Sequence, residues 1–265
     1  MEFERVSVTG HGPVAVLTLN HPEVMNALSE WMLVGAAAAL DFVAKPENGF
    51  RALIFTGEGK SFCSGANLAD GPIEGATDIP SGIGIRMDEF YHPLLRRFRD
   101  LPMPVVSAVN GPAVGIGMSF ALMGDLVLAA RSAYFLQAFA KIGLIPDGGA
   151  SWLLPRLIGL ARARELSLLA EKLPAEKALE WGLINRVCDD GALQDEALAL
   201  ASRLAEGPTL AFAAMRRLYW DSPENGYERQ LEREREAQME ASATEDFMEG
   251  VSAFLQKRPP LFKGR

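Results

Sequence analysis

The chain is poor in the residues that build disulfide frameworks and metal sites, with two cysteines and three histidines among 265 residues. Cys63 and Cys188 are too few for a disulfide framework. His11, His21 and His92 are scattered without the spacing of metal ligands. We therefore expect no metal site.

The sequence also lacks a long apolar run and an excess of positive charge. Its first residues, MEFERVSVTG, have no basic-then-apolar pattern, and the most apolar region is interrupted by Asn110, Pro112 and Asp125. Neither a secretion signal nor a membrane span is predicted. The net charge of -8 argues against nonspecific nucleic-acid binding, which depends on Lys and Arg. We expect a cytoplasmic protein with no nucleic-acid or membrane partner.

The stretch from Pro104 to Ala130, PVVSAVNGPAVGIGMSFALMGDLVLAA, has the pattern of a strand, a glycine loop and a helix. After the β-branched start, Asn110-Gly111-Pro112 turns the chain and Gly115-Ile116-Gly117 opens a run with helical spacing. Such a loop exposes N–H groups that can bind an anion or an oxygen developing negative charge. The alternative is that the glycines only allow tight packing of helix against strand.

Three better-known glycine motifs do not fit. A dinucleotide fingerprint needs a glycine where this chain has Phe120, and a serine-hydrolase elbow needs one at Ala121. Gly-Glu-Gly-Lys-Ser at 57–61 resembles the end of a phosphate-binding loop, but the required earlier glycine is Ile54. The glycine loop is thus not explained by nucleotide binding or by a serine nucleophile.

The order of elements before and after this stretch indicates an α/β fold. Runs at 6–9 and 14–19 predict an opening hairpin, 29–43 a helix and 51–56 a buried strand. Residues 88–99 predict an amphipathic helix. Further expected elements are strands at 126–129, 134–135 and 183–187, and helices at 150–157, 161–170, 174–181 and 193–205. Asp125 is expected to cap or terminate its helix rather than act on a substrate.

Two segments have patterns of their own. Ala69 to Arg86 contains four glycines and two prolines with little periodicity, which favours a long mobile loop, either a substrate lid or a disordered insertion. From Pro208 to Phe254 the pattern is helical throughout. Its interleaved Glu and Arg at 228–236 predict a solvated helix face, while its Met and aromatic residues would suit an oligomer contact.

A second glycine loop, Ser64-Gly65-Ala66-Asn67, follows the strand at 51–56. If neighbouring strands each deliver one free N–H to a common point, the two loops form an oxyanion hole that stabilises an enolate or a tetrahedral intermediate. One such donor contributes about 3 kcal/mol of transition-state stabilisation. This arrangement suits thioester chemistry.

Along nearly its whole length the chain resembles the crotonase superfamily, also called the enoyl-CoA hydratase/isomerase superfamily. The resemblance is carried by HPEVMNALS at 21–29, FCSGANL at 62–68, AVNGPAVGIGMSFALMGDLVLA at 108–129, IGLIPDGGASWLLPRLIG at 142–159 and EWGLINRV at 180–187. Each motif is modest alone, and together in this order they are highly specific.

The resemblance implies an α/β fold made of a spiral of β-β-α units at 1–205, holding the CoA and active sites, and a C-terminal helical trimerisation region at 206–265. It also implies an acyl-CoA thioester as substrate, a homotrimer or dimer of trimers, and no cofactor beyond the coenzyme A of the substrate. By motif position the two oxyanion donors would be the N–H groups of Ala66 and Ile116.

The departures from the family pattern concern the catalytic carboxylates. Hydratases of the family use two glutamates to handle water, and this chain has Ser119 and Phe139 at those positions. Without them, addition of water has no obvious acid or base. For Ser119 we favour a small polar residue on a packed helix, and for Phe139 a wall of the acyl pocket. Cys63, beside the loop, is interpreted as a small buried filler.

Asp147 remains, at a position where some members of the family carry a catalytic aspartate, including dienoyl-CoA isomerases and ring-1,2-epoxyphenylacetyl-CoA isomerases. KIGLIPDGGASWLLPRLIGLARA and the tail AFLQKRPPLFKGR are most similar to the last group. From local sequence alone, an aspartate before Gly148-Gly149 is more readily explained as a helix N-cap. The family position favours catalysis, and Asp147 could serve both purposes.

The resemblance also suggests which residues contact coenzyme A and the acyl group, with the tail residues coming from a neighbouring subunit. Family members often carry Lys or Arg near 23 and 24, where this chain has Glu and Val, which weakens the expectation of phosphate contacts at that turn. The expected substrate and CoA contacts are Glu23, Val24, Met25, Ala27, Ser64, Gly65, Asn67, Leu68, Gly115, Ser119, Phe139, Phe262 and Lys263.

The sequence-based hypothesis is an acyl-CoA isomerase that shifts a double bond or opens a strained ring, with Asp147 as acid and base and Ala66 and Ile116 as oxyanion donors. The nearest alternative is an enoyl-CoA hydratase. A non-catalytic acyl-CoA-binding homologue, which kept the fold after losing both glutamates, is the alternative of another class.

Overall fold

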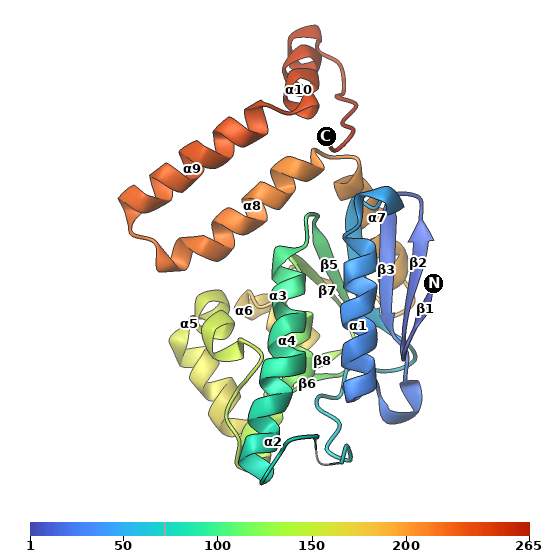
Figure 1. The fold of residues 1–265 in the computed structure, drawn as a ribbon, viewed down its shortest axis with the longest axis vertical. Helices are drawn as coiled ribbons and strands as arrows, with labels where there is room; N and C mark the ends of the chain where they lie inside the picture. The colour runs from blue at the N-terminus through green and yellow to red at the C-terminus, as the bar shows by residue number, and fades with distance from the viewer. Residues whose placement is uncertain (72) are drawn as a thin grey trace.

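The computed structural model describes residues 1–71 and 73–265, and its centre is a seven-stranded sheet (Figure 1). The strand order is β1-β2-β3-β4-β5-β7-β10. The first three strands pair antiparallel, and β3, β4, β5, β7 and β10 pair parallel. The strands are β1 (Glu2–Phe3), β2 (Val6–His11), β3 (Val14–Leu19), β4 (Ala52–Gly57), β5 (Val105–Val109), β7 (Leu126–Ala130) and β10 (Arg186–Cys188).

A second sheet of three short strands holds the loops that follow β5 and β7. Its order is β6-β8-β9, with β6 pairing parallel to β8 and β8 antiparallel to β9. These strands are β6 (Ala113–Val114), β8 (Tyr134–Leu136) and β9 (Leu173–Pro174). The glycine loop at 115–117 therefore directly follows a strand, β6, that is held in this sheet.

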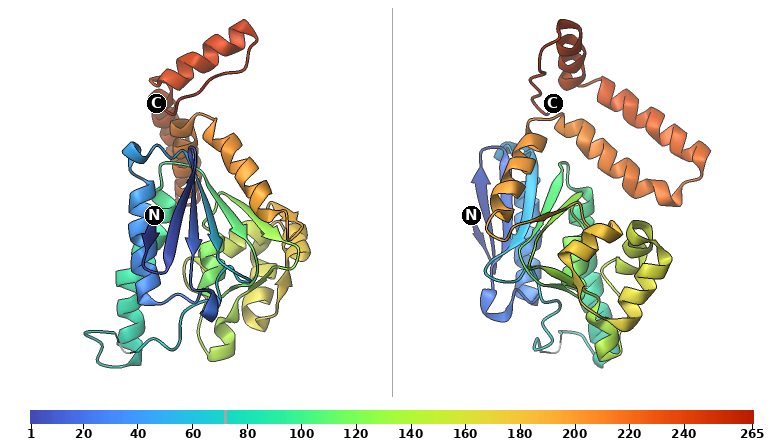
Figure 2. Two further views of the ribbon diagram at one scale, coloured as in Figure 1. Left: turned by 90° about the vertical axis from the view of Figure 1, so that its right-hand side faces the viewer. Right: turned by 180° about the vertical axis from the view of Figure 1, so that it is seen from behind.

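The core lies on both faces of the large sheet because β4 and β5 are buried at every position. Helix α1 contacts β2 and β3, α3 packs on α1, and α7 contacts β3, β4 and β5. Figures 1 and 2 show α1 and the rod formed by α2 and α3 on one face and α7 on the other. Strands that are buried on both faces require such double cover.

The helices begin where the sequence supplies caps and turns. Ser29 accepts a hydrogen bond from the Met32 amide and so caps α1, in line with the predicted helix start. The α-helices are α1 (Glu30–Val43), α2 (Ile79–Arg86), α3 (His92–Asp100), α4 (Ile116–Ala121), α5 (Ala150–Leu169), α6 (Ala175–Trp181), α7 (Leu193–Ala205), α8 (Thr209–Asp221), α9 (Tyr227–Ser242) and α10 (Glu245–Gln256). Short 3₁₀ turns are η1 (Pro22–Val24), η2 (Pro46–Asn48), η4 (Ala138–Ile142) and η5 (Ser222–Glu224), and η3 (Met87–Tyr91) is a π-helical turn.

The expected loop from 69 to 86 is shorter than the sequence suggested. Asp78 and Ser81 form a capping box, and α2 runs from there through η3 into α3 as one rod. Glycines in this helix obscured its periodicity. Pro72, within the expected loop, lies outside the described residues.

Smaller differences follow from local backbone geometry. The two helices expected at 150–157 and 161–170 are present as the two parts of α5, which are separated by a kink where Gly159 takes the non-helical angles φ 78° and ψ 157°. The strand expected at 183–187 is observed later, at Arg186–Cys188, where it pairs with β7. Within the described residues, no helix combines the length and the apolarity needed to cross a membrane.

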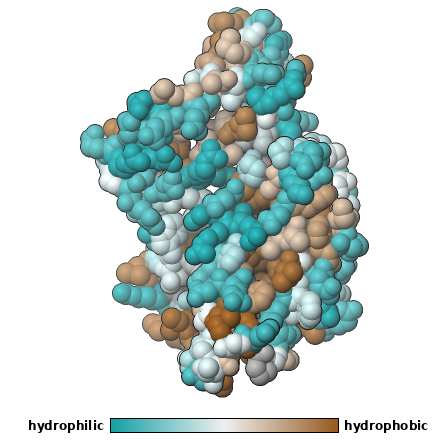
Figure 3. All heavy atoms as spheres, viewed as in Figure 1, coloured by the Kyte–Doolittle hydropathy of each residue, from teal (hydrophilic) through white to brown (hydrophobic). Residues whose placement is uncertain are grey.

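The C-terminal helices α8, α9 and α10 extend from one end of the molecule (Figures 1 and 2). Hydrophilic side chains cover most of α9 in the view of Figure 3, in agreement with the charge run. Arg216 of α8 is buried. Its guanidinium binds the Asp125 carboxylate and donates to the Phe98 carbonyl at 2.9 Å. Asp125 also accepts from the Val105 amide at 2.7 Å. Its expected role as a helix cap was wrong, because tertiary partners use its carboxylate.

Candidate active site

The loop that carries Ala66 is fixed on the side of α1 by a parallel bridge. The Leu28 amide donates to the Gly65 carbonyl at 2.8 Å, and the Asn67 amide donates to the Leu28 carbonyl at 3.1 Å. In a parallel pair, Leu28 forms hydrogen bonds with the residues before and after its partner Ala66, and not with Ala66 itself. The N–H of Ala66 is then directed away from Leu28. The N–H of Ala66 is accordingly without a hydrogen-bond partner in the part of the chain that the structure describes.

The same loop is fixed on its other side to the strand before α4. The Cys63 amide donates to the Pro112 carbonyl at 3.0 Å, and the Val114 amide donates to the Cys63 carbonyl at 2.9 Å. A Cβ on Gly117 would lie 2.6 Å from the Cys63 oxygen, so only glycine allows this approach. The structure thus brings the two glycine loops into direct contact.

The second N–H belongs to Ile116, the first residue of α4. Gly115 adopts φ 55° and ψ -128°, a conformation open to glycine, and its own amide is bound by the Leu136 carbonyl at 2.8 Å. The first N–H of a helix has no intrahelical acceptor. Among the described residues, Ala66 and Ile116 therefore both have an N–H without an acceptor, and they belong to two loops that are in contact. An oxyanion hole requires such a pair of donors.

Asp147 lies against the first turn of α4. The Ser119 hydroxyl donates to the Asp147 carbonyl at 2.9 Å. Gly148 has φ 61°, and a Cβ there would lie 2.8 Å from the Ser119 Cβ and 3.1 Å from the Ile116 Cγ1. The absence of a side chain at Gly148 lets the Asp147 segment approach the loop that presents the Ile116 N–H.

The carboxylate of Asp147 does not cap the next helix. Gly149 occupies the N-cap position of α5, and no side chain there accepts a capping hydrogen bond within the described chain. The Asp147 Oδ1 atom is buried and has no hydrogen-bond partner among the described residues. The cap interpretation was wrong, and the reason is that the side chain is turned toward the interior instead of the helix end.

Burial changes the acidity of this group. Desolvation raises the pKa of Asp147 from 3.8 to about 6. A carboxyl with a pKa near neutrality exchanges protons more readily in both directions than an exposed aspartate, so it can act as base and acid in one cycle. Cys63, by contrast, is fully buried and its pKa is raised to about 12, which leaves an unreactive thiol and supports its interpretation as a filler.

Ser119 and Phe139 occupy the positions where the family's hydratases carry glutamates, and both are buried. Ser119 does more than pack, because its hydroxyl holds the Asp147 carbonyl. Phe139 lies beside the glycine loop, since a Cβ on Gly115 would be 3.8 Å from its ring. It is placed as a wall next to Ile116.

The expected CoA contacts at 23–27 and 64–68 lie side by side. The Ser64 amide donates to the Met25 carbonyl at 3.0 Å, and the Ser64 hydroxyl donates to the Val24 carbonyl at 3.3 Å. Glu23, Val24 and Met25 are exposed, whereas Ala27 is buried. The surface formed by this turn and by the exposed Leu68 is open to a ligand.

Asn26, which the sequence interpretation left out of the site, holds this turn in place. Its side chain accepts from the His21 amide at 2.8 Å and donates to the Glu58 and Ser61 carbonyls at 3.0 and 2.8 Å. It is fully buried with φ 54°. Asparagine tolerates this left-handed conformation. An Asn shortly after a proline turn could therefore have identified this structural role from the sequence.

Phe262 and Lys263 lie far from these residues within the chain. The Arg51 guanidinium donates to the Phe262 carbonyl at 3.1 Å, and the Lys263 amide donates to the Asp246 carboxylate. Arg51 precedes β4 whereas Ala66 follows it, and a six-residue strand spans about 20 Å. These two tail residues cannot reach the site of their own chain, so the expected contact requires another subunit.

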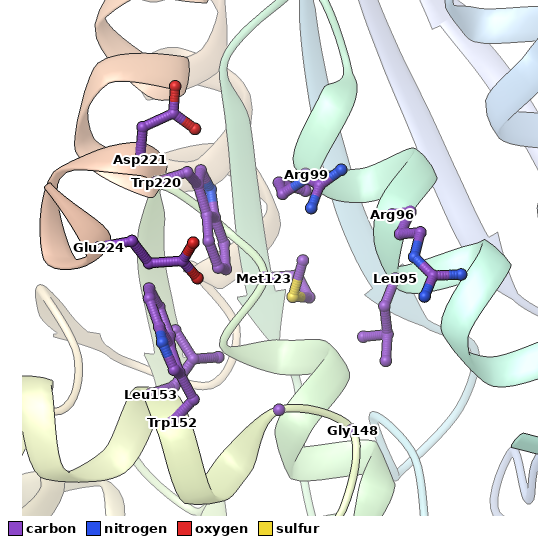
Figure 4. A pocket seen from close by; sticks show the side chains of 11 residues that line it. Leu95, Arg96, Arg99, Met123, Gly148, Trp152, Leu153, Trp220, Asp221 and Glu224 are labelled. Atoms are coloured by element: carbon purple, nitrogen blue, oxygen red, sulfur yellow. The ribbon is translucent and has the colours of Figure 1, made fainter.

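Two cavities adjoin the site. One, of about 290 Å³, is lined mainly by apolar and aromatic side chains from α3, α5 and α8, with Gly148 at its edge (Figure 4). The Trp152 and Trp220 rings stack on each other along one side of it, with their centroids 5.4 Å apart. The other, of about 590 Å³, begins at Leu68 and Asp70 and extends under α2. One cavity therefore adjoins the residue after Asp147, and the other is lined by a residue of the Ala66 loop.

The whole chain is similar to proteins of known sequence and structure. The pattern described as enoyl-CoA hydratase/isomerase matches residues 9–265. The chain is 45% identical to the 1,2-epoxyphenylacetyl-CoA isomerase of Escherichia coli, and 44% identical to a "Probable enoyl-CoA hydratase" of Rhodobacter capsulatus, each over 252 residues that cover 95% of both chains. Its fold is similar to that of enoyl-CoA hydratase subunit I of Geobacillus kaustophilus, with a TM-score of 0.90, 32% identity and full coverage of both chains.

Proposed function

Because the chain belongs to the enoyl-CoA hydratase/isomerase family and has its fold, we propose that it is an acyl-CoA isomerase that works through an enolate and a single aspartate. The reaction is a double-bond shift or the opening of a strained ring in the acyl group of a thioester. The arrangement of two free N–H groups and one carboxylate is what such a reaction needs.

The proposed mechanism assigns one role to each group. The thioester carbonyl oxygen binds between the N–H groups of Ala66 and Ile116. Asp147 removes a proton next to the carbonyl, and the electron pair moves into the thioester as an enolate whose oxygen the two donors stabilise. In a double-bond shift, Asp147, now protonated, returns the proton at another carbon. In ring opening, the electron pair of the enolate breaks the C–O bond of the ring, and the proton of Asp147 goes to the released oxygen. Ser119 positions Asp147 by holding its backbone carbonyl.

The observation that carries the proposal is the state of Asp147. Its Oδ1 is buried without a partner in the described chain, and the adjacent Gly148 packs against Ser119 and Ile116. Ser119 and Phe139 provide no second carboxylate, so addition of water is less well supported than proton transfer within the substrate. The name of the Escherichia coli relative is in line with this proposal.

The first experiment is incubation with a panel of acyl-CoA thioesters in deuterated water, with mass spectrometry of carbon-bound deuterium and of added water. We expect deuterium exchange without hydration. Asp147→Asn should lower the exchange rate by a factor of about 10³, within the range for loss of a general base. Asp195→Asn, the same change at an exposed position on α7, serves as the control.

The remaining outcomes decide between the alternatives. Hydration of crotonyl-CoA at a rate comparable with exchange would establish a hydratase, the function that the name of the Rhodobacter capsulatus relative suggests. Tight thioester binding without exchange would favour a non-catalytic homologue. Exchange that survives in Asp147→Asn would remove the assignment of the base.

We further propose that residues 1–205 form the catalytic spiral and that residues 206–265 mediate assembly into a trimer or a dimer of trimers. The tail supports this proposal because Phe262 and Lys263 can contribute to a CoA site only in a neighbouring subunit. Large apolar side chains on α10, including Met248, Phe254 and Leu255, are exposed in the single chain. Assembly would cover them.

A further inference from the structure

The proposed mechanism gives no role to several buried polar atoms that lack a hydrogen-bond partner among the described residues, and one of them is the hydroxyl of Tyr91. The residue is buried, and its hydroxyl has no hydrogen-bond partner in the described part of the chain. Buried hydroxyls in proteins are nearly always bonded, so an exception calls for an explanation such as a ligand that supplies the acceptor.

The local backbone places Tyr91 at a distinctive point. The His92 amide donates to the Met87 carbonyl, which makes a π-helical turn between α2 and α3. The next residue, Pro93, has no N–H and cannot continue the preceding hydrogen-bond pattern. Single π-turns inside helices occur frequently at functional sites.

Tyr91 and Asp147 each neighbour a residue that lines the Trp-lined cavity of Figure 4. Leu95, one turn beyond Tyr91 on the same helix face, lines this cavity, and so does Gly148, which directly follows Asp147. Tyr91 is also close enough to Asp147 for the carboxylate charge to act on its hydroxyl. An acyl group bound with its thioester at Ala66 and Ile116 would pass Asp147 and enter this space.

We propose that the Tyr91 hydroxyl donates a hydrogen bond to an oxygen carried by the acyl group, and so selects thioesters whose acyl group bears a cyclic ether, epoxide or carbonyl oxygen. The inference rests on the proposed function, because it takes the thioester to be bound at the two free N–H groups. It deepens that function by favouring opening of an oxygen-containing ring over a double-bond shift in a plain hydrocarbon.

The acidity of Tyr91 agrees with a donor. Burial, and then the negative charge of Asp147, raise the pKa of Tyr91, while Arg86 opposes the shift. The phenol thus keeps its proton and is available to donate a hydrogen bond to an acceptor oxygen. A hydrocarbon at the same place would leave the hydroxyl unpaired, and sites built to bond an oxygen discriminate strongly against analogues that lack it.

The test compares ligands that differ by one oxygen. Cyclohexylacetyl-CoA and the three tetrahydropyranylacetyl-CoA isomers, in which the ring oxygen replaces a different CH₂, are titrated calorimetrically into the full-length protein. We expect at least one ether isomer to bind about tenfold more tightly than the carbocycle. Tyr91→Phe should abolish this preference and change the Kd of cyclohexylacetyl-CoA by less than twofold.

Controls separate a direct contact from a packing effect. Tyr134→Phe, the same change at a half-buried tyrosine on β8, should retain the ether preference. Equal weakening of all four ligands in Tyr91→Phe would overturn the proposal, because it would show a packing role. No ether preference in the unmodified protein would overturn it without any variant.

A failure of the proposed function can be distinguished from a failure of the Tyr91 proposal. Deuterium exchange into the same four thioesters is followed in deuterated water. If the unmodified protein catalyses no exchange, the isomerase proposal is overturned, while the ether preference can still be observed. Asp147-dependent exchange without an ether preference would overturn only the role of Tyr91.

Discussion

At the scale of single residues, the proposed activity depends on an ionised Asp147 carboxylate at a buried position, where the charged form is unfavourable. Burial favours its neutral form, and no described group donates a hydrogen bond to its Oδ1. The same feature makes it a better proton donor and acceptor near neutral pH than an exposed aspartate. Activity at this site is therefore expected at a cost in stability.

The pH dependence of exchange follows from the pKa of about 6. The base form is the carboxylate, so kcat/KM should be constant at high pH, fall to half near pH 6, and then fall tenfold for each further unit. A pH series of the exchange rate measures this profile. A profile flat to pH 4.5 would contradict Asp147 as the base.

The stability of the fold should change with pH in the direction opposite to activity, and decrease as the pH rises. The folded pKa lies above the unfolded value of 3.8, so the folded protein binds more protons between about pH 4 and pH 6. The ionised carboxylate thus costs stability above pH 6, and this cost disappears as the pH falls toward 4. Asp147→Asn should be more stable than the unmodified protein by on the order of 2 kcal/mol at pH 8, with the difference lost near pH 4, as measured by urea unfolding.

At the scale of elements, the oxyanion site depends on how closely the first turn of α4 approaches the Cys63 loop. A Cβ on Gly117 would lie within 2.8 Å of the Cys63 Cβ, oxygen and sulfur atoms. Both Ala66 and Ile116 belong to these two segments. Separation of the segments would move the two N–H groups apart.

Gly117→Ala is expected to lower the exchange rate by on the order of a hundredfold, comparable with loss of one oxyanion donor. It should also destabilise the fold by about 1–3 kcal/mol through overpacking. Exchange assays and urea unfolding measure the two effects. Gly226→Ala is the control, because Gly226 has φ -71° and a Cβ there meets no described atom within 4 Å. Unchanged exchange in Gly117→Ala would count against the paired donors.

At the scale of the whole molecule, the α8–α10 extension is joined to the core through few buried contacts. Arg216 of α8 binds Asp125 and the carbonyl groups at the end of α3, and breaking such a buried pair typically costs about 3–5 kcal/mol. Beyond this point, the apolar side chains of α10 are exposed. The arrangement suits an extension whose second partner is another copy of the chain.

We expect sedimentation velocity to show a trimer or a hexamer, and Phe254→Glu to shift it toward monomer. Phe254 is 82% exposed in the single chain, and a charge there would be buried on assembly. Gln256→Glu adds the same charge at a neighbouring exposed position and should have a smaller effect. If Phe254→Glu assembles like the unmodified protein, α10 is not part of the interface.

Most elements could be predicted from the sequence because their signals are local. β-branched runs predicted β3, β4 and β5, and Ser29 marked the start of α1. The family motifs identified both glycine loops and Asp147. The rod from Ile79 to Asp100 was only partly predicted, because glycines and a proline in it weaken the helical pattern while packing on α1 supports it.

The sequence by itself determined the family, the α/β architecture and the presence of one acidic residue after two glycine loops, because these depend on residue types at short spacing. Only the tertiary structure decided that Asp147 does not cap α5, that the Ser119 hydroxyl holds it and that Tyr91 is buried without a partner. The reason is physical: a polar group's partners lie tens of residues away along the chain, so whether it is satisfied or free is settled only when the folded chain brings distant segments together.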